Sequence, residues 1–209
     1  MLFIDDTPMK FELPDADVTY YPHFFSAEES DFLMAYLLKN IAWQQDTIRV
    51  FNKTHWQPRL TAFYGDLDKT YRYSTIEMQP NTWDAVLLSI KQRIDNLLDT
   101  SFTSVLLNWY RNGKDSNGWH ADNEKELGKN PIIASVSFGA TRVFQLKHHT
   151  IKDAKCQLNL EHGSLLVMKG TTQHFWKHQI PKTSKPVADR VNLTFRILYS
   201  NDILDQKKQ

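Results

Sequence analysis

The segment Arg190-Val191-Asn192-Leu193-Thr194-Phe195-Arg196-Ile197 alternates strictly between polar and apolar side chains. Successive side chains of a strand point to opposite faces, so this period of two predicts a β-strand. Its apolar face holds Val191, Leu193, Phe195 and Ile197. Its polar face holds Arg190, Asn192, Thr194 and Arg196. Taken alone, such a polar face indicates a strand with one side in water.

Further strand-like runs precede this segment, and turn residues separate them. These runs cover 102–111, 132–138, 142–147, 156–160 and 164–168, and the last run of the series, at 191–199, contains most of the segment above. Gly139-Ala140 predicts a hairpin turn, and Gly163 and Gly170 bracket one of the strands. Many short strands late in the chain, with helices confined to its front, favour the α+β class. We expect a double-stranded β-helix, or jelly roll, flanked by N-terminal helices.

Two helices are predicted before residue 100. Ser26 begins the first, and Glu29 three residues later completes a capping box. An apolar stripe on this helix consists of Phe32, Leu33, Tyr36 and Leu37. The second helix begins near Asn81, and its apolar residues recur at spacings of three and four. The rest of this part reads as an irregular extended segment, two strand-like runs and a polar, aromatic loop, at 1–25, 47–51, 60–64 and 69–74.

Composition excludes several classes of protein. The hydrophobic fraction of 41% and aromatic fraction of 12% are enough for a core, and 209 residues suit one domain. A net charge of +1 excludes a strongly polybasic protein. The single Cys156 excludes an internal disulfide and a cysteine-rich zinc site. The N-terminus does not resemble a signal peptide and no apolar run could span a bilayer, so we expect an intracellular protein without membrane contact.

A candidate metal motif lies in Trp119-His120-Ala121-Asp122. On an extended backbone His120 and Asp122 share one face, where an imidazole and a carboxylate can bind a divalent ion. One more imidazole would give two histidines and one carboxylate, the set typical of non-haem Fe(II) oxygenases. His174 and His178 are the candidates for the third ligand. Nearby Gly and Thr residues argue against a helix there, whereas His148 and His149 are expected to be exposed.

Other polar side chains are expected to converge near this motif. Asn108 and Tyr110 share one face of a predicted strand, just before the His120 and Asp122 pair. Together with the polar face of 190–196 they indicate a pocket for an anionic ligand. Arginine binds carboxylates through two hydrogen bonds, so Arg190 and Arg196 suit a ligand with two carboxylates.

The sequence resembles the AlkB family of Fe(II)/2-oxoglutarate dioxygenases, from about residue 50 to residue 199. The resemblance rests on ordered motifs, namely LNWY at 107–110, HAD at 120–122, IASVSFGA at 133–140, HGSLL at 162–166, His178 and RVNLTFR at 190–196. It is closest to the branch that contains the nuclear DNA- and RNA-repair members of animals. Trp109 departs from the family pattern, which has a basic or other hydrophilic residue there.

The resemblance implies roles for individual residues. Fe(II) would be held by His120, Asp122 and His178, which settles the choice between His174 and His178. The cosubstrate 2-oxoglutarate would be held by Asn108, Tyr110, Arg190, Asn192, Thr194 and Arg196. A nucleotide-recognition lid would include Phe51, Tyr71, Arg72, Tyr73 and Ser74, and the target base would be contacted by Asn123 and Glu124. Basic residues interleave with the aromatics of this lid, which favours nucleic-acid contact, at Lys53, Arg59, Lys69 and Arg72.

The implied enzyme is an oxidative demethylase that uses Fe(II), 2-oxoglutarate and O2. It would remove methyl groups from N1-methyladenine and N3-methylcytosine in alkylated DNA or RNA. We expect one catalytic domain over 1–209, with helical support and lid at 1–100, a jelly-roll core at 101–199 and a tail at 200–209. A monomer is expected, in a bacterial cytoplasm, or in the nucleus of a eukaryote. The alternatives are a hydroxylase of the same class acting on a protein or small molecule, and a non-catalytic jelly roll.

Overall fold

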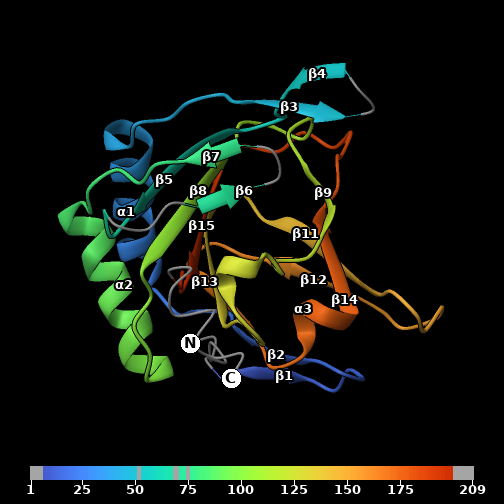
Figure 1. The fold of residues 1–209 in the computed structure, drawn as a ribbon. Coiled ribbons are helices and arrows are strands. Elements are labelled where there is room, and N and C mark those ends of the chain that lie inside the picture. Colours follow the sequence, from blue (N-terminus) through green and yellow to red (C-terminus); the bar gives the residue numbers. More distant parts are fainter. Residues whose placement is uncertain (1–6, 51–52, 68–70, 74–75, 200–209) are drawn as a thin grey trace.

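Two antiparallel sheets form the body of the protein (Figure 1), seen in a computed structural model that describes residues 7–50, 53–67, 71–73 and 76–199. The seven-stranded sheet has the order β1 (Met9–Phe11), β2 (Asp17–Tyr21), β13 (Ser164–Lys169), β10 (Ile133–Gly139), β15 (Arg190–Arg196), β8 (Ser104–Tyr110) and β5 (Leu60–Gly65). The four-stranded sheet has the order β12 (Lys155–Leu160), β11 (Arg142–His148), β14 (Trp176–Ile180) and β9 (Asn117–His120). The predicted jelly-roll class is confirmed.

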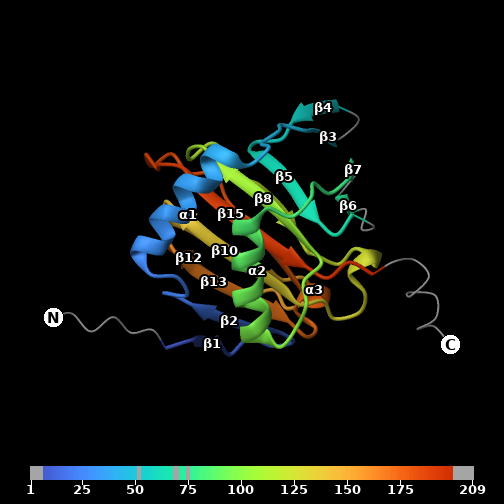
Figure 2. The ribbon, with the colours of Figure 1, turned by 90° about the vertical axis from the view of Figure 1, so that its left-hand side faces the viewer.

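Two helices cover the outer face of the seven-stranded sheet (Figure 2), namely α1 (Ala27–Asn40) and α2 (Ala85–Leu98). The predicted capping box of α1 is present, because the Ser26 side chain accepts from the Glu29 backbone and Glu29 accepts from the Ser26 backbone. Phe32, predicted in the apolar stripe, is instead 64% exposed. The second helix begins at Ala85, later than predicted, because Asp84 accepts hydrogen bonds from the first turn. Of the described helices, none has the length and apolar character needed to cross a bilayer.

The apolar residues form two clusters, one on each side of the seven-stranded sheet. Leu37, Leu87 and Ile90 of the helices pack with Leu193 and Phe195 of β15 on the outer side. Burial of each such side chain stabilises the fold by about 1.5–3 kcal/mol. The other cluster lies between the two sheets. Every residue of β15 is therefore buried, and its polar face lines an internal cavity, as the predicted ligand pocket requires, although the segment taken alone indicated a face in water.

Several local predictions are wrong because pairing between distant segments decides them. The segment read as irregular contains β2, which pairs with β13. Gly139-Ala140 is not a hairpin turn, since β10 and β11 lie in different sheets. A short helix, α3 (Thr172–Phe175), forms where none was expected. His148 is buried and stacks on Phe175, although His149 is exposed as predicted.

Two hairpins flank the edge strand β5. The first, β3 (Thr47–Val50) and β4 (Lys53–Trp56), precedes it, and the second, β6 (Tyr71–Tyr73) and β7 (Ile76–Met78), follows it. Of the loop predicted at 69–74, residues 71–73 form the strand β6 instead. Both project near one end of the sheets (Figure 2). They comprise the predicted lid, of which Phe51 and Ser74 lie outside the described residues.

The Gly139→Ala variant should be destabilised by at least about 1–3 kcal/mol, the range for a non-glycine residue held in a strained backbone conformation. Gly139 has a φ of +88°, and a Cβ there would lie 2.4 Å from the Asp189 carbonyl oxygen. Urea unfolding would measure the loss. Gly118→Ala is the matched control, since a Cβ at Gly118 meets nothing within 4 Å. Equal stability of the two variants would contradict the prediction.

Candidate active site

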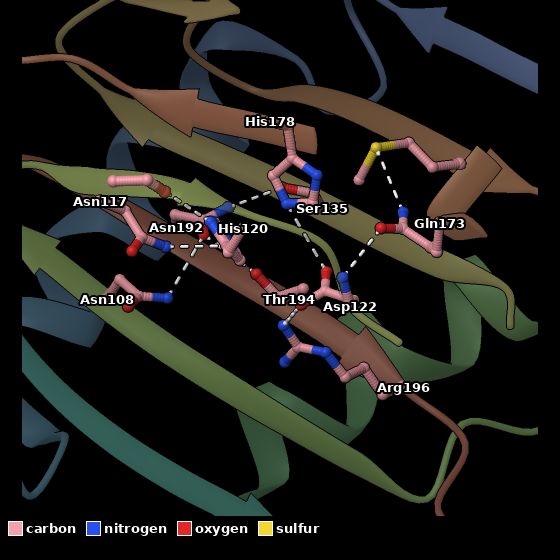
Figure 3. A network of polar contacts seen from close by, with 12 residues as sticks. Asn108, Asn117, His120, Asp122, Ser135, Gln173, His178, Asn192, Thr194 and Arg196 are labelled. Atoms are coloured by element: carbon pink, nitrogen blue, oxygen red, sulfur yellow. Dashed lines mark hydrogen bonds and ion pairs between the residues drawn. The ribbon is translucent and has the colours of Figure 1, made fainter. Parts of the chain in front are cut away.

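The three predicted metal ligands come together between the sheets (Figure 3). His120 is the last residue of β9, and it pairs with His178 on the neighbouring strand β14. Asp122 follows two residues after His120, in the connection to a short 3-10 helix, η1 (Lys125–Leu127). One potential ligand atom from each of the three lies within 4.8 Å of the others. This spacing fits a single divalent ion.

Asp122 is held as a charged carboxylate. Its Oδ1 accepts a hydrogen bond of 2.8 Å from Arg196 Nη2, and its backbone N–H donates to Gln173 Oε1 at 2.9 Å. Burial alone would raise the pKa of this carboxyl, but the charge of Arg196, and the charges that the two histidines acquire on protonation at low pH, lower it to about 2. The hydrogen bond to Oδ1 leaves Oδ2 facing His178 Nε2, at 3.8 Å. Arg196 thus orients the carboxylate for a metal.

Both histidines present a lone pair. His120 Nδ1 lies 2.7 Å from the Gly118 carbonyl oxygen, which can only accept, so Nδ1 carries the hydrogen and Nε2 does not. His178 stacks on Phe144, with 5.2 Å between ring centroids. Burial, and then the neighbouring His120, lowers the pKa of His178 to about 3. Burial also lowers the pKa of His120, so both imidazoles are neutral near pH 7, the form that binds a metal.

Acid should destabilise the metal-free protein through His178. Its pKa is 6.5 when unfolded and about 3 when folded, so the unfolded state takes up the proton first as the pH falls below 6.5. Between about pH 7.5 and about pH 5 the free energy of unfolding should therefore drop by about 2 kcal/mol from this group. Urea unfolding with a chelator present measures it. His178→Gln is the control and should lose that part of the drop; an identical pH dependence would contradict the prediction.

A cavity extends from the metal ligands to the polar face of the seven-stranded sheet. Its lining includes all the residues predicted to hold the metal or the cosubstrate, namely Asn108, Tyr110, His120, Asp122, His178, Arg190, Asn192, Thr194 and Arg196. These residues come from four strands and one connection, which are far apart in the sequence. The cavity is therefore a product of the sheet pairing.

Arg190 is the cation in this cavity that has donors to spare. Its side chain is 1% exposed, with Nη2 donating to Ser137 Oγ at 2.9 Å and the guanidinium 5.1 Å from the Tyr110 ring centroid. Its Nε and Nη1 atoms have no hydrogen-bond partner within the described part of the chain. Burial lowers the pKa of Arg190 to about 10. A buried guanidinium with two unfilled donors fits a ligand carboxylate. By contrast, the carboxylate partner of Arg196 is Asp122.

Asn192 is held rigidly beside Arg190. Its Nδ2 donates to Ser135 Oγ and the Val136 carbonyl at 2.8 and 2.9 Å, and its Oδ1 accepts from Thr194 at 3.0 Å. Sequence reasoning assigned no role to the supporting residues Ser135, Ser137 and Gln173. The alternation of 133–139 places both serines on one face and could have indicated them, whereas nothing local pointed to Gln173.

Comparison with known proteins agrees with this geometry. Residues 17–196 match the 2OG-Fe(II) oxygenase superfamily. The human alpha-ketoglutarate-dependent dioxygenase alkB homolog 3 is 43% identical over 191 residues, which are 87% of this chain and 66% of that protein. Human DNA oxidative demethylase ALKBH2 is 38% identical over 186 residues, 84% of this chain and 71% of that protein. The chain belongs to the AlkB family.

The AlkB fold is also seen in a solved structure. The structure of OsALKBH1 superposes on this protein with a TM-score of 0.57 at 15% sequence identity. The superposition covers 91% of this chain and 100% of the OsALKBH1 chain. The chain spans slightly less than two thirds of the length of the alkB homolog 3 relatives, 66% of the human protein and 65% of the bovine one. Membership of the family implies Fe(II), 2-oxoglutarate and O2, and the donor set described above fits the metal and the cosubstrate.

The structure places Trp109, which departs from the AlkB pattern, and His174, which was the alternative third metal ligand. Trp109, the departure from the pattern, lies on the opposite face of β8 from Asn108 and donates to Asp189 Oδ1 at 2.7 Å. It does not line the cavity. His174, the rival ligand, is exposed and contacts Asn130, at 2.9 Å between the side chains. His178 is thus the histidine that joins the metal set, although the short helix α3 was not foreseen.

The described residues that were predicted to contact the substrate lie in two parts of the chain, the strand β6 and the segment that follows Asp122. Tyr71, Arg72 and Tyr73 form β6 of the second hairpin. Asn123 is exposed and Glu124 is half-buried, and neither lines the cavity. β9 ends at His120, and Glu124 lies beyond it as the N-cap residue of η1, where its own backbone is still extended (φ −61°, ψ 148°). The base-contacting roles of these residues stay predictions.

Arg59 differs from the other basic residues assigned to the lid. It is 4% exposed, and its Nε donates to Asn108 Oδ1 at 2.6 Å. Its Nη1 donates to the Ser116 carbonyl oxygen at 3.2 Å. The sequence prediction of a phosphate contact through Arg59 is therefore wrong, because the side chain lies inside the protein against a cavity residue.

Proposed function

We propose that this protein is an Fe(II)- and 2-oxoglutarate-dependent oxidative demethylase of N1-methyladenine and N3-methylcytosine in DNA or RNA. The observation that carries the proposal is one cavity that contains both a facial His-Asp-His set and a buried arginine with unfilled donors. The similarity to human DNA oxidative demethylase ALKBH2 supports the choice of nucleic acid as the substrate class.

The residues of the chain would divide the work between metal and cosubstrate. His120, Asp122 and His178 would hold Fe(II), and Arg190 would anchor one carboxylate of 2-oxoglutarate. When bound, Fe(II) and 2-oxoglutarate would supply, together with O2, the chemistry that oxidises an N-methyl group. The oxidised methyl group would then leave the base as formaldehyde. Asn192 and Tyr110 line the path between the arginine and the metal set and would orient the cosubstrate. The two sheets exclude water from the centre, as such chemistry requires.

A base must leave the helix stack to reach this cavity, because the metal set lies between two sheets. The two hairpins that flank β5 would contact the extruded nucleotide. Their aromatic and basic residues, Tyr71, Arg72 and Tyr73, suit stacking and phosphate contact. A base whose methyl group prevents normal pairing is extruded at less expense of free energy than a paired one.

Mass spectrometry of repaired oligonucleotides tests the proposal. The protein would be incubated with Fe(II), ascorbate and 2-oxoglutarate, and with single- and double-stranded DNA and RNA that contain either methylated base. A loss of the mass of one methylene group, dependent on 2-oxoglutarate, is expected. Intact binding of iron and 2-oxoglutarate without any change in mass would overturn the proposal and favour a hydroxylase acting on a protein or small molecule.

A further inference from the structure

The outer face of the four-stranded sheet has a charge pattern that the active site does not explain. Phe144, Leu146, Leu158 and Trp176 point into the core between the sheets. Their neighbours in the strands point the other way, at Gln145, Lys147, Lys155, Gln157, Lys177 and Gln179. The sheet lies on the opposite side of the molecule from α1 and α2 (Figure 1), so no helix of the support covers this face.

Three lysines form a row across the sheet. Lys147 on β11 lies directly opposite Lys155 on β12 and opposite Lys177 on β14. Neighbouring strands are about 4.8 Å apart, so the three Cα positions span about 10 Å. Like charges directly opposite each other are destabilising. Within the described residues, none of the three lysines forms an ion pair with a carboxylate.

The strands that carry this row have no acidic residue of their own. None of the four strands contains Asp or Glu, although the whole chain has 24 acidic residues against 25 basic ones. A parallel row of amides, Gln157, Gln145 and Gln179, lies beside the lysines and is linked by side-chain hydrogen bonds. Such a face is positively charged and rich in hydrogen-bond donors.

A trough follows the same face and includes an exposed aromatic ring. One depression is lined by Trp119, Lys147, Lys155 and two members of the amide row, Gln145 and Gln157. A second shares Gln145 and Gln157 with it and reaches Lys182 and Lys185. Trp119 is 38% exposed, and the Lys147 ammonium lies 4.2 Å from its ring centroid. Ring, amides and ammonium groups thus line one continuous path.

This path begins beside the metal set. Trp119 immediately precedes His120, so one side chain points outward and the other into the cavity. β9, which carries both, is an edge strand of its sheet. A polymer whose target unit occupies the cavity can therefore pass round this edge onto the outer face without crossing another strand.

We propose that the outer face of the four-stranded sheet binds the sugar-phosphate backbone of the single strand that flanks the target base. Lysine ammonium groups match successive phosphates without reading sequence, and Trp119 offers a ring on which a base can stack. Phosphomonoester ligands would favour the paired hydrogen bonds of arginine, and a bilayer would need more exposed apolar anchors than one tryptophan. The proposal rests on the proposed function for the identity of the polymer.

Fluorescence anisotropy with unmodified single-stranded DNA tests the surface. Oligonucleotides of about 5 and about 20 nucleotides lie near the lower end and beyond the upper end of the usual single-strand site sizes. The Lys155→Ala/Lys177→Ala variant should weaken binding of the long strand only. The slope of log affinity against log salt should fall by about 1.4, at about 0.7 for each single-strand phosphate contact. Trp119→Ala should weaken the same binding about tenfold.

Matched controls separate this surface from general charge and from catalysis. Lys10→Ala/Lys39→Ala removes the same charge from β1 and α1 and should leave affinity for the long strand higher than the test variant does. Demethylation of the short methylated strand should be unchanged in the test variants. If wild-type protein demethylates nothing but its long-strand binding still depends on Lys155 and Lys177, the proposed function fails and the surface stands.

Three outcomes would overturn the proposal. Equal affinities and salt slopes in the test and control variants would show that the lysine row contacts no phosphates. Equal weakening for short and long strands would place the effect in the active site. If the Lys155→Ala/Lys177→Ala variant lost the binding of the wild type to vesicles of phosphatidylserine and phosphatidylcholine but still bound DNA normally, the face would be a lipid-binding surface. Unfolding temperature would be recorded for each variant, and removing the like-charged row should not lower it.

Discussion

Replacing Asp122 with alanine should abolish iron binding and turnover together. The carboxylate lies between His178 and Arg196 and is the only anionic member of the candidate metal set. Removing a residue that hydrogen-bonds to a metal ligand typically lowers metal affinity about 10- to 100-fold. Removing the ligand itself should therefore lower iron affinity by more than about a hundredfold. Titration of the chelator-treated protein with Fe(II), followed by the demethylation assay, would measure both.

The alanine variant also breaks the buried ion pair between Arg196 and Asp122, a change that costs about 3–5 kcal/mol of stability. Asp122→Asn separates the two effects. Its amide oxygen can still accept the hydrogen bond from Arg196, but the side chain carries no charge for the metal. We expect this variant to remain more stable than the alanine variant while iron binding is still lost. Wild-type iron affinity in Asp122→Asn would contradict the assignment.

Replacing Arg190 with methionine should remove 2-oxoglutarate binding with little harm to the fold. Truncating one partner of a buried, hydrogen-bonded charge pair costs about 2–5 kcal/mol, or about 30-fold to several thousandfold in affinity. In the ligand-free protein, however, Nε and Nη1 of Arg190 are buried and have no hydrogen-bond partner among the described residues. An apolar chain of similar length removes that buried charge, so the unfolding temperature without ligand should not fall.

Calorimetric titration with 2-oxoglutarate, using Mn(II) in place of Fe(II), would measure this loss. Arg93→Met is the control, because the Arg93 side chain is 43% exposed on the helical side and pairs with Glu29. That variant should bind 2-oxoglutarate like the wild type. If Arg190→Met also bound it normally, the cosubstrate carboxylate would have to lie elsewhere in the cavity.

The sequence by itself predicted whatever depends on short-range regularity. The alternation of 190–196 indicated a strand with a separate polar face, and Ser26 with Glu29 indicated the start of α1. Both follow from fixed geometry, because side chains alternate along a strand and an N-cap side chain reaches the third residue on. The motifs around His120 and Arg190 also predicted the family.

Only the tertiary structure decided what these faces contact. Pairing of β14 with β9 places His178 opposite His120, and packing of the sheets brings Arg196 to Asp122 across 74 positions. The same packing buries both faces of β15, leaves Arg190 with spare donors and turns Arg59 inward. The physical reason is that sheet order depends on the combined burial of segments far apart in the chain. No local period records which strands will be neighbours.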